Sequence, residues 1–327
     1  TAYDIILGLV GSEMCIRDRS NGGLTDASLF HGRDCILSGP AGGVVGAVRT
    51  TAMANFEKII CFDMGGTSTD VSHYAGNFER AFESQVAGVR MRAPMMHIHT
   101  VAAGGGSILH FDGARFTVGP DSAGANPGPT CYRRGGPLTV TDCNVMLNKL
   151  IPEFFPRVFG PNGDEPLDRS IVVEKFKCLA NQITNTNDET MTPEEVAEGY
   201  LTIAVENMAN AIKKISIQRG YDVSEYVLSC FGGAGGQHAC LVADALGMKQ
   251  VFLHPLAGVL SAYGMGLADV RAMREQAVES ILDDKLISEI ESGLNELEAK
   301  GFAELKSQDC LLYTSDAADE GLGVDLG

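Results

Sequence analysis

The sequence has few basic residues for its number of acidic ones. Its 25 Lys and Arg stand against 42 Asp and Glu, which gives a formal net charge of −17 at pH 7. Nucleic acids and anionic membrane surfaces are bound by clustered Lys and Arg, so this balance argues against both as partners. No apolar run reaches the roughly 18 residues that a membrane-spanning helix needs. Any phosphate that this protein binds must therefore be held locally, by backbone N–H groups and a cation.

Several motifs that define common site types are also missing. The chain has no Walker A sequence, and its glycine spacing differs from the G-x-G-x-x-G fingerprint of dinucleotide-binding folds. Its nine cysteines include no Cys-x-x-Cys pair and no zinc-like spacing. This usage is typical of reduced, mostly buried thiols, and it predicts a cytoplasmic protein without disulfides.

What is present is a globular composition with unusual ends. With 327 residues, 45% of them hydrophobic and 20% charged, the chain can form one large or two medium domains. Residues 1–19, including "LVGSEMCIRDR", and residues 310–327, including "CLLYTSDAADE", resemble in-frame translations of sequencing-library adaptors. We therefore expect residues 20–309 to carry the natural sequence, and we expect both end segments to pack poorly and to hold no site.

The first part of this sequence predicts strands separated by glycine turns. "ILSGPAGGVVGAV" (36–48) predicts a short strand, a turn and a small-residue helix. "KIICF" (58–62) predicts a buried strand, and "DVSHYAGNFE" (70–79) predicts a second strand that reaches a hairpin turn at Gly76-Asn77. Residues 100–120 predict two strands joined at Asp112-Gly113. Residues 119–137, which are rich in Gly and Pro, predict a long ordered loop.

The second part predicts helices and a parallel strand pair. Thr192, Pro193 and Glu195 form a capping box at the start of a helix. Apolar residues recur along this helix at spacings of 4, 3, 4, 3 and 4 and form one stripe: Ala197, Leu201, Ala204, Met208, Ala211 and Ile215. Gly220 is a residue of the type that favours the end of a helix. "YVLSCFGGAGGQHACLVADALGMKQVFLHP" (226–255) predicts a βαβ unit with Gly247 ending its helix. Alternating strands and helices of this type indicate an α/β fold.

The stretch "FDMGGTSTDVS" (62–72) carries the clearest chemistry. Glycine amides can approach a phosphate without a Cβ in the way, and Thr hydroxyls add donors. We assign phosphate binding to Gly65, Gly66, Thr67 and Thr69, and magnesium binding to Asp63 and Asp70, since carboxylates are the ligands that magnesium prefers. Asp63 is also the candidate catalytic residue. A tight hairpin turn without a ligand is the alternative interpretation of the same residues.

A second glycine cluster lies between a predicted strand and a predicted helix. Gly232, Gly233, Gly235 and Gly236 are placed where helix N-terminal amides favour an anion or a polar nucleotide group. We assign this cluster to the ribose or adenine end of a nucleotide. Two strand-end glycine loops, one with paired aspartates, indicate the two-lobed ATPase fold that actin, Hsp70 chaperones and sugar kinases share.

Other polar residues have weaker signals. His97 and His99, two apart on a strand, could bind a metal, but a buried structural pair is favoured. Asp121 and Asp142 could reach a cleft or act as caps or turn residues. His238 is expected to cap a helix start. The cysteines beside the glycine loops are expected to be buried small hydrophobes rather than nucleophiles; they are Cys131, Cys230 and Cys240.

Seven motifs together resemble the hydantoinase A/5-oxoprolinase family over Ser20 to Val270. In chain order they are "LSGPAGGVVGA", "FDMGGTSTDVS", "HTVAAGGGS", "VGPDSAGANPGP", "TVTDCNV", "FGGAGGQHAC" and "GVLSAYGMGLADV". The segment "GGAGGQHAC" with Gln237, and "CYRRGGPLTVTD", are most similar to the ATP-dependent 5-oxoprolinases. The N-methylhydantoinase and acetone carboxylase branches remain alternatives.

The resemblance implies an actin/Hsp70/sugar-kinase-like ATPase fold, represented here by one lobe and parts of the second. It also implies ATP and Mg2+ as cofactors, and opening of a cyclic amide, with 5-oxoproline converted to glutamate or a hydantoin as substrate. The family pattern adds an amino-terminal lobe with a second phosphate motif and a hydantoinase B-like partner domain, neither of which these residues contain. We expect an oligomer in the intact form and an inactive chain in isolation. A non-catalytic nucleotide-binding module and a folded remnant that binds nothing are the alternatives from other classes.

Overall fold

The computed structural model describes residues 16–86, 89–187, 190–281 and 283–308. The chain divides into two compact units. One comprises residues 1–46, 77–96 and 261–327, and the other comprises residues 47–76 and 97–260. All of the predicted site residues fall in the second unit, which is described first.

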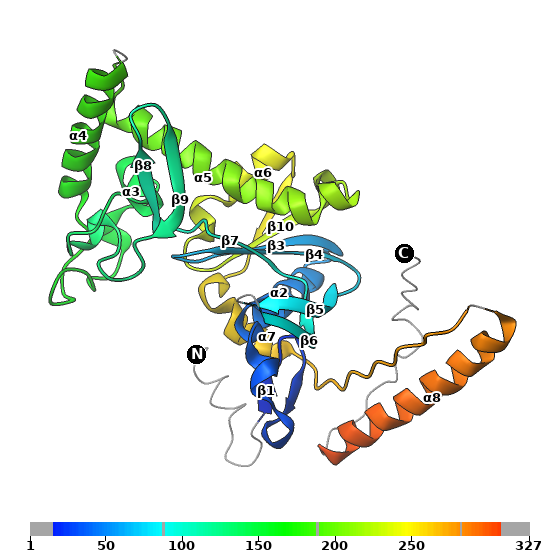
Figure 1. Ribbon diagram of the computed structural model, residues 1–327. Helices are drawn as coiled ribbons and strands as arrows, with labels where there is room; N and C mark the ends of the chain where they lie inside the picture. The colour runs from blue at the N-terminus through cyan, green and yellow to red at the C-terminus, as the bar shows by residue number, and fades with distance from the viewer. Residues whose placement is uncertain (1–15, 87–88, 188–189, 282, 309–327) are drawn as a thin grey trace. The chain divides into compact units, whose positions relative to one another are not determined.

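A mixed five-stranded sheet forms the centre of the second unit, with the strand order β11-β10-β3-β4-β7 (Figure 1). Its strands are β3 (Lys58–Met64), β4 (Thr69–Ala75), β7 (His99–Val101), β10 (Val227–Phe231) and β11 (Gln250–Leu253). β3 pairs antiparallel with β4, which pairs antiparallel with β7. On its other side, β3 pairs in parallel with β10, and β10 with β11. The carboxyl ends of β3 and β10 therefore meet at one edge of the sheet.

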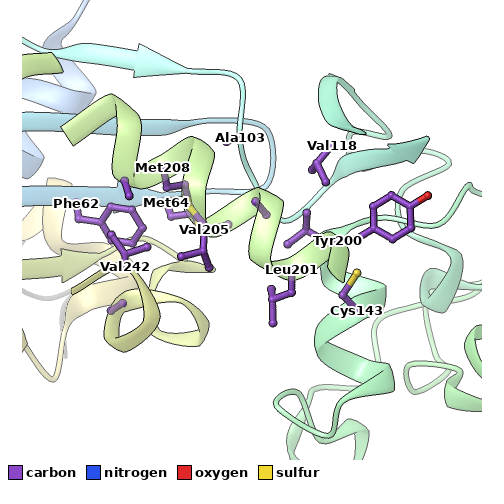
Figure 2. Packing of buried hydrophobic residues seen from close by; sticks show 14 of the residues in the cluster. Phe62, Met64, Ala103, Val118, Cys143, Tyr200, Leu201, Val205, Met208 and Val242 are labelled. Atoms are coloured by element: carbon purple, nitrogen blue, oxygen red, sulfur yellow. The ribbon is translucent and has the colours of Figure 1, made fainter. Parts of the chain in front are cut away.

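The long predicted helix is confirmed as α5 (Pro193–Ile215), and it organises the core of this unit. Its capping box forms as expected, and every residue of the predicted stripe is buried. Figure 2 shows that Val205 and Met208 lie near Phe62 and Met64 of β3, whereas Tyr200 and Leu201 lie near Val118 and Cys143. α5 ends before Gly220, which instead closes the short 3-10 turn η5 (Ile217–Arg219) at φ +87°.

The predicted βαβ unit is also confirmed. β10 leads through the 3-10 turn η7 (Gly235–Gln237) into α6 (Ala239–Leu246), and the chain returns as β11 parallel to β10. Gly247 follows α6 in the left-handed region at φ +68°, as its predicted role at the helix end requires. All five residues of β10 are buried, which suits a strand inside a sheet.

A hairpin and two helices complete the second unit. The predicted strand pair is confirmed as β8 (Ser107–Phe111) and β9 (Phe116–Ser122), which pair antiparallel. The helices are α3 (Val140–Met146) and α4 (Arg169–Asn187). The remaining short 3-10 turns are η3 (Thr130–Tyr132), η4 (Pro152–Phe154), η6 (Val223–Glu225) and η8 (Ala257–Val259).

The Gly/Pro segment 119–137 is less irregular than its composition predicts. β9 continues through Asp121 to Ser122, so Asp121 lies on a strand and not in the loop, and η3 interrupts the remainder. Asp121 accepts a hydrogen bond from His110 on the neighbouring strand, at 2.9 Å, and both side chains are exposed. The β8–β9 pairing supplies the regularity that local composition could not reveal.

Two further local predictions are wrong. No strand precedes the small-residue helix, because α2 (Ser38–Met53) already begins at Ser38, and Pro40 is tolerated where a helix has no N–H partner to lose. Gly76-Asn77 does not join a hairpin either. β4 is the second strand of a hairpin with β3, turning at residues 65–68, and the strand after Asn77 pairs elsewhere.

In its described residues, the first unit contains two strand pairs and two helices apart from part of α2. Asp18 lies at the end of its first strand, with a buried side chain whose two carboxylate oxygens have no hydrogen-bond partner in the part of the chain that the structure describes. This burial raises the pKa of Asp18 to about 7. The elements are β1 (Ile16–Asp18) and β2 (Leu24–Asp26), β5 (Arg80–Val86) and β6 (Val89–Met96), the 3-10 turns η1 (Ala27–Leu29) and η2 (Gly32–Cys35), and the helices α7 (Leu260–Leu267) and α8 (Asp284–Ser307).

The end segments predicted to be foreign fall largely outside the described residues. Residues 1–15 and 310–327 are not described, whereas residues 16–18 pair through their backbone with β2. Within the described part of the chain, no helix combines the length and the apolar character needed to cross a membrane.

Candidate nucleotide and metal site

The two predicted glycine loops follow neighbouring strands, so the fold brings them together. In the register of the sheet, Asp63 near the end of β3 lies opposite Phe231, the last residue of β10. The first loop (residues 65–68) follows β3, and the second loop (residues 232–236) follows β10. Both loops leave the sheet at its carboxyl edge, where the parallel strands of α/β proteins commonly place their ligand sites.

The loops are also in direct contact. The Ala234 amide donates to the Met64 carbonyl at 3.0 Å. Gly232 has φ +84°, and a Cβ at this position would lie 2.4 Å from Asp63 Oδ1 and 2.4 Å from the Met64 oxygen. Only glycine allows this approach, so the second loop can lie against the Asp63 carboxylate at the end of β3.

A third glycine segment, which the sequence analysis did not assign to the site, supports the first loop. Gly105 N–H donates to the Gly65 carbonyl at 3.1 Å, and Gly106 N–H donates to the Gly66 carbonyl at 2.6 Å. A Cβ on Gly104 would lie 2.7 Å from a backbone atom of Thr67. The signal was present in the sequence as three consecutive glycines after a strand, where a close backbone approach is the usual reason.

These contacts divide the amides of the first loop into two groups. Gly65 N–H donates to the Ser68 carbonyl at 3.0 Å and so closes the turn. The N–H groups of Gly66 and Thr67 make no hydrogen bond within the described residues, and both residues are exposed. The amides free to bind an anion are therefore those of Gly66 and Thr67.

The two predicted threonines differ in the same way. Thr67 lies exposed in the turn. Thr69 is fully buried, and its hydroxyl donates to the Ala103 carbonyl. The Thr67 side chain is thus accessible to a ligand, whereas the Thr69 hydroxyl proton already joins β4 to the segment after β7.

Asp63 and Asp70 lie directly opposite each other on β3 and β4. Burial, and after it the charge of Asp70, raises the pKa of Asp63 to about 6. Asp70 accepts a hydrogen bond from Thr100 Oγ1 at 2.6 Å, but the Asp63 carboxylate has no hydrogen-bond or ion-pair partner among the described residues. Two adjacent carboxylates, one of them unpaired and half-buried, are suited to share a divalent cation, which would relieve their repulsion.

The second loop has a different supporting shell. Residues 232–236 are four glycines and one alanine, so this loop has no charged side chain. The Gly232 N–H donates to the Ala257 carbonyl at 3.1 Å. Behind it, Asn144 Nδ2 donates to Gln237 Oε1 at 2.7 Å and lies 3.1 Å from His238 Nε2. His238 precedes α6 as predicted, but its fully buried side chain makes no capping bond. The contact with α3 could not be foreseen because it joins residues far apart in sequence.

α3 is anchored by Asp142, which confirms the capping interpretation of that residue. Its fully buried carboxylate accepts bonds from the N–H groups of Thr130, Cys131 and Thr139 and from the Thr139 hydroxyl, at 2.8–3.0 Å. Burial raises the pKa of Asp142, and the hydrogen bonds from Cys131 and Thr139 act in the opposite direction. Asp142 therefore ties the Gly/Pro segment to the start of α3.

The remaining histidine and cysteine candidates lie apart from a metal or nucleophile site. His97 is exposed and His99 half-buried, so the expected buried pair is not formed, and no cluster of three ligating side chains occurs among the described residues. Cys131 and Cys230 are buried as expected, and burial raises the pKa of both thiols. Cys240 is exposed, contrary to expectation, because it faces outward from α6.

Comparison with known proteins places these features in context. A family model described as hydantoinase/oxoprolinase matches residues 14–274. 5-Oxoprolinase 1 of Arabidopsis thaliana is 48% identical over 279 residues, which are 83% of this chain and 22% of that protein. 5-Oxoprolinase of Saccharomyces cerevisiae is 47% identical over 293 residues, which are 89% of this chain and 23% of that protein. The chain thus spans less than a quarter of the length of these relatives.

Two solved structures share the fold. The ATP-dependent caprolactamase of Pseudomonas jessenii superposes with a TM-score of 0.76 at 29% identity, covering 94% of this chain and 44% of that one. A nucleotide-free acetone carboxylase, from work on ATP-dependent acetone carboxylation, superposes with a TM-score of 0.69 at 25% identity, covering 91% and 42%. Both support the mixed α/β architecture described above.

Proposed function

Because the chain belongs to the hydantoinase/oxoprolinase family, we propose that it forms the nucleotide-binding part of an ATP-dependent enzyme that opens a cyclic amide, with 5-oxoproline as substrate and glutamate as product. The observation that carries this proposal is the meeting of two glycine loops and two aspartates at one sheet edge. The higher identity to 5-oxoprolinases than to the caprolactamase subunit, 48% against 33%, favours the five-membered lactam.

The sheet supports a finer assignment of the fold. An antiparallel run β3-β4-β7 is extended on the other side of β3 by the parallel strands β10 and β11. We assign this arrangement to one lobe of the actin/Hsp70/sugar-kinase fold. In that fold the ligand lies between two lobes, so the assignment accounts for two loops that reach the same edge without enclosing a site by themselves.

Within this site the two loops would bind different parts of ATP. The free amides of Gly66 and Thr67, with the Thr67 hydroxyl, would contact phosphate oxygens. Asp63 and Asp70 would hold magnesium, which neutralises charge on the phosphates when bound. The uncharged second loop, including Gly232, would lie at the ribose or adenine end.

The chemistry explains why a cyclic amide hydrolase would use ATP. A five-membered lactam is stabilised by amide resonance, so its carbonyl carbon is a poor electrophile towards water. Transfer of the γ-phosphoryl group to the amide oxygen would give ADP and an imidate phosphate, whose carbon water attacks more readily. The ring C–N bond of the resulting tetrahedral intermediate would then break and release the amino group, and a second water would hydrolyse the acyl phosphate that remains to the carboxylate and inorganic phosphate. The task of this chain in such a reaction is to fix the phosphates in line and to balance developing charge.

The decisive experiment measures both halves of the proposal. Calorimetric titration of this chain with ATP, with and without Mg2+, tests nucleotide binding, and ADP and glutamate formation from 5-oxoproline tests the activity of the full-length protein that contains it. We expect magnesium-dependent binding by the chain and 5-oxoproline-dependent ATP turnover by the full-length protein. ATP turnover that is indifferent to 5-oxoproline, caprolactam and hydantoins would contradict the enzyme assignment and favour a nucleotide-binding module.

A further inference from the structure

A small polar cluster lies behind the second glycine loop. It consists of Asn144 on α3, Gln237 at the end of η7, and His238, which directly precedes α6. Asn144 and His238 are both fully buried, and Gln237 is half-buried. Asn144 contacts both partners through one atom, Nδ2, at 2.7 Å from Gln237 Oε1 and 3.1 Å from His238 Nε2.

The shared atom fixes the polarity of both hydrogen bonds. A carboxamide nitrogen has two hydrogens and only donates. Gln237 must therefore contribute its carbonyl oxygen, and His238 the lone pair of Nε2. It follows that the Gln237 NH2 group faces away from Asn144, and that neutral His238 carries its proton on Nδ1. Burial, followed by the charge of Lys149, lowers the pKa of His238 to about 4, which agrees with a neutral ring.

The outward NH2 group of Gln237 is a hydrogen-bond donor without a partner. The described residues provide no acceptor for it, and it is absent from the enclosed unpaired atoms, so it is open to a ligand. The cluster itself leaves Asn144 Oδ1 and His238 Nδ1 enclosed, with no hydrogen-bond partner in the described ranges. Such polar groups are unfavourable in a core, and a role in orienting Gln237 accounts for their presence where an apolar side chain would pack at lower cost.

We propose that Asn144 is a positioning residue that sets the orientation of the Gln237 carboxamide, so that Gln237 donates a hydrogen bond from its NH2 group to the nucleoside portion of ATP at the second glycine loop. This inference rests on the proposed function for the identity of the ligand. The acceptor is a ring nitrogen or a ribose oxygen, because the phosphates belong to the first loop.

The ligand half is tested by titration of the chain with Mg-ATP and with Mg-pyrophosphate, which lacks the nucleoside. Gln237→Glu keeps an oxygen for Asn144 but replaces the donor with an acceptor, so ATP affinity should fall about tenfold or more while pyrophosphate affinity stays unchanged. Gln182→Glu on the exposed face of α4 adds the same charge elsewhere and should alter neither. Equal ATP affinity of wild type and Gln237→Glu overturns the role of Gln237.

The positioning half is tested by the tautomer of His238, read from 15N NMR of the histidine rings. The wild type should show a neutral ring protonated on Nδ1. Asn144→Asp offers only acceptors, so the proton of His238 should move to Nε2, Gln237 should turn its NH2 group inward, and ATP affinity should fall about tenfold while pyrophosphate binding remains. If the His238 ring of the wild type is protonated on Nε2, the proposed orientation of the Asn144 and Gln237 carboxamides is wrong.

The two kinds of failure can be told apart. If the wild-type chain binds neither ATP nor pyrophosphate, the proposed function fails and with it the role of Gln237 as a nucleotide contact, whereas the NMR result still decides how Asn144 orients its neighbours. If pyrophosphate binds and Gln237→Glu leaves the ATP affinity unchanged, the proposed function stands and this inference falls.

Discussion

The two glycine loops at the edge of the central sheet look alike in sequence but differ in how they are built. The first loop lies beside two aspartates and exposes two unpaired amides, at Gly66 and Thr67. The second loop has no charged side chain, and buried amide and imidazole groups support it from behind. The difference teaches that glycine content alone marks the place where a ligand can approach, whereas the surrounding groups decide which part of that ligand is bound.

The loops nevertheless share one support, helix α3. The amide and the hydroxyl of Thr141 both donate to the Gly105 carbonyl at 2.8 Å, and Gly105 in turn holds the first loop through Gly65. Asn144, one turn later on the same helix, holds the second loop through Gln237. A change that frees α3 should therefore affect both loops, whereas a change within one loop should leave the other intact.

The largest effect is expected from Asp142→Ala, which should free α3 and so weaken the support of both loops. Loss of this acceptor leaves the buried N–H groups of Cys131 and Thr139 unpaired, and each costs about 1–3 kcal/mol, whereas the Thr130 N–H keeps the Pro137 carbonyl as its acceptor. We expect urea unfolding to show a loss of about 3–5 kcal/mol, with weaker binding of both Mg-pyrophosphate and Mg-ATP. Asp112→Ala is the control, because Asp112 also accepts two backbone bonds but is exposed. A loss confined to one ligand would show that α3 supports only one loop.

Asp63→Ala should distinguish the two loops, because it removes a carboxylate beside the first loop and leaves the second loop unchanged. Without this carboxylate, magnesium loses a ligand next to the phosphates, and we expect the full-length protein to lose at least about 100-fold in magnesium-dependent ATP hydrolysis. The melting temperature should not fall, since the half-buried Asp63 side chain makes no hydrogen bond or ion pair among the described residues. Asp244→Ala on the exposed face of α6 serves as the charge-matched control. Unchanged turnover at saturating ATP would contradict the assignment of Asp63.

Gly232→Ala should test the contact between the loops. The new methyl group would lie 2.4 Å from Asp63 Oδ1 and from the Met64 oxygen, in a backbone conformation with φ +84°. We expect a loss of roughly 1–3 kcal/mol in the free energy of unfolding, together with weaker ATP binding. Gly233→Ala, whose methyl group would meet nothing within 4 Å, should change stability by much less. Similar stabilities of the two variants in a urea titration would argue against the close approach.

The smallest effects should come from Thr67 in the first loop and Thr69 at the start of β4, and they should be opposite in kind. Thr69→Val removes a buried bond to the Ala103 carbonyl, so stability should fall by about 1 kcal/mol with little change in ligand affinity. Thr67→Val changes an exposed side chain, so stability should be kept while Mg-pyrophosphate binds a few-fold more weakly. Calorimetry and urea unfolding on both variants check this pair, and a binding loss in Thr69→Val alone would reverse the roles.

The sequence predicted those elements whose signals are local. The periodic stripe of α5, its capping box and the glycine after α6 all rest on interactions within a few turns, and all are confirmed. The same reasoning located both glycine loops, because each directly follows a short apolar strand. It failed for the strand expected before Ser38, where α2 begins earlier than the proline suggested.

What the sequence could not predict depends on pairing between distant segments. The extension of β9 through Asp121 needs β8 as a partner, and composition alone indicated a loop. The support of the first loop by Gly105, and of the second by Asn144, joins residues that no periodic pattern relates. His238 was expected to cap α6 from its position alone, whereas its side chain turns towards α3.

The parallel pairing of β3 with β10 also has a consequence for the order in which the protein is made. Asp63 and Phe231 lie side by side although about half of the chain separates them. During synthesis, the first glycine loop can form its hairpin with β4 early, but it has no partner on the other side of β3 until β10 has emerged. Contacts of such long range form slowly, because a large loop must close before they are gained. A nascent chain halted before Phe231 would thus expose one edge of β3, with its apolar residues, to other chains and to chaperones.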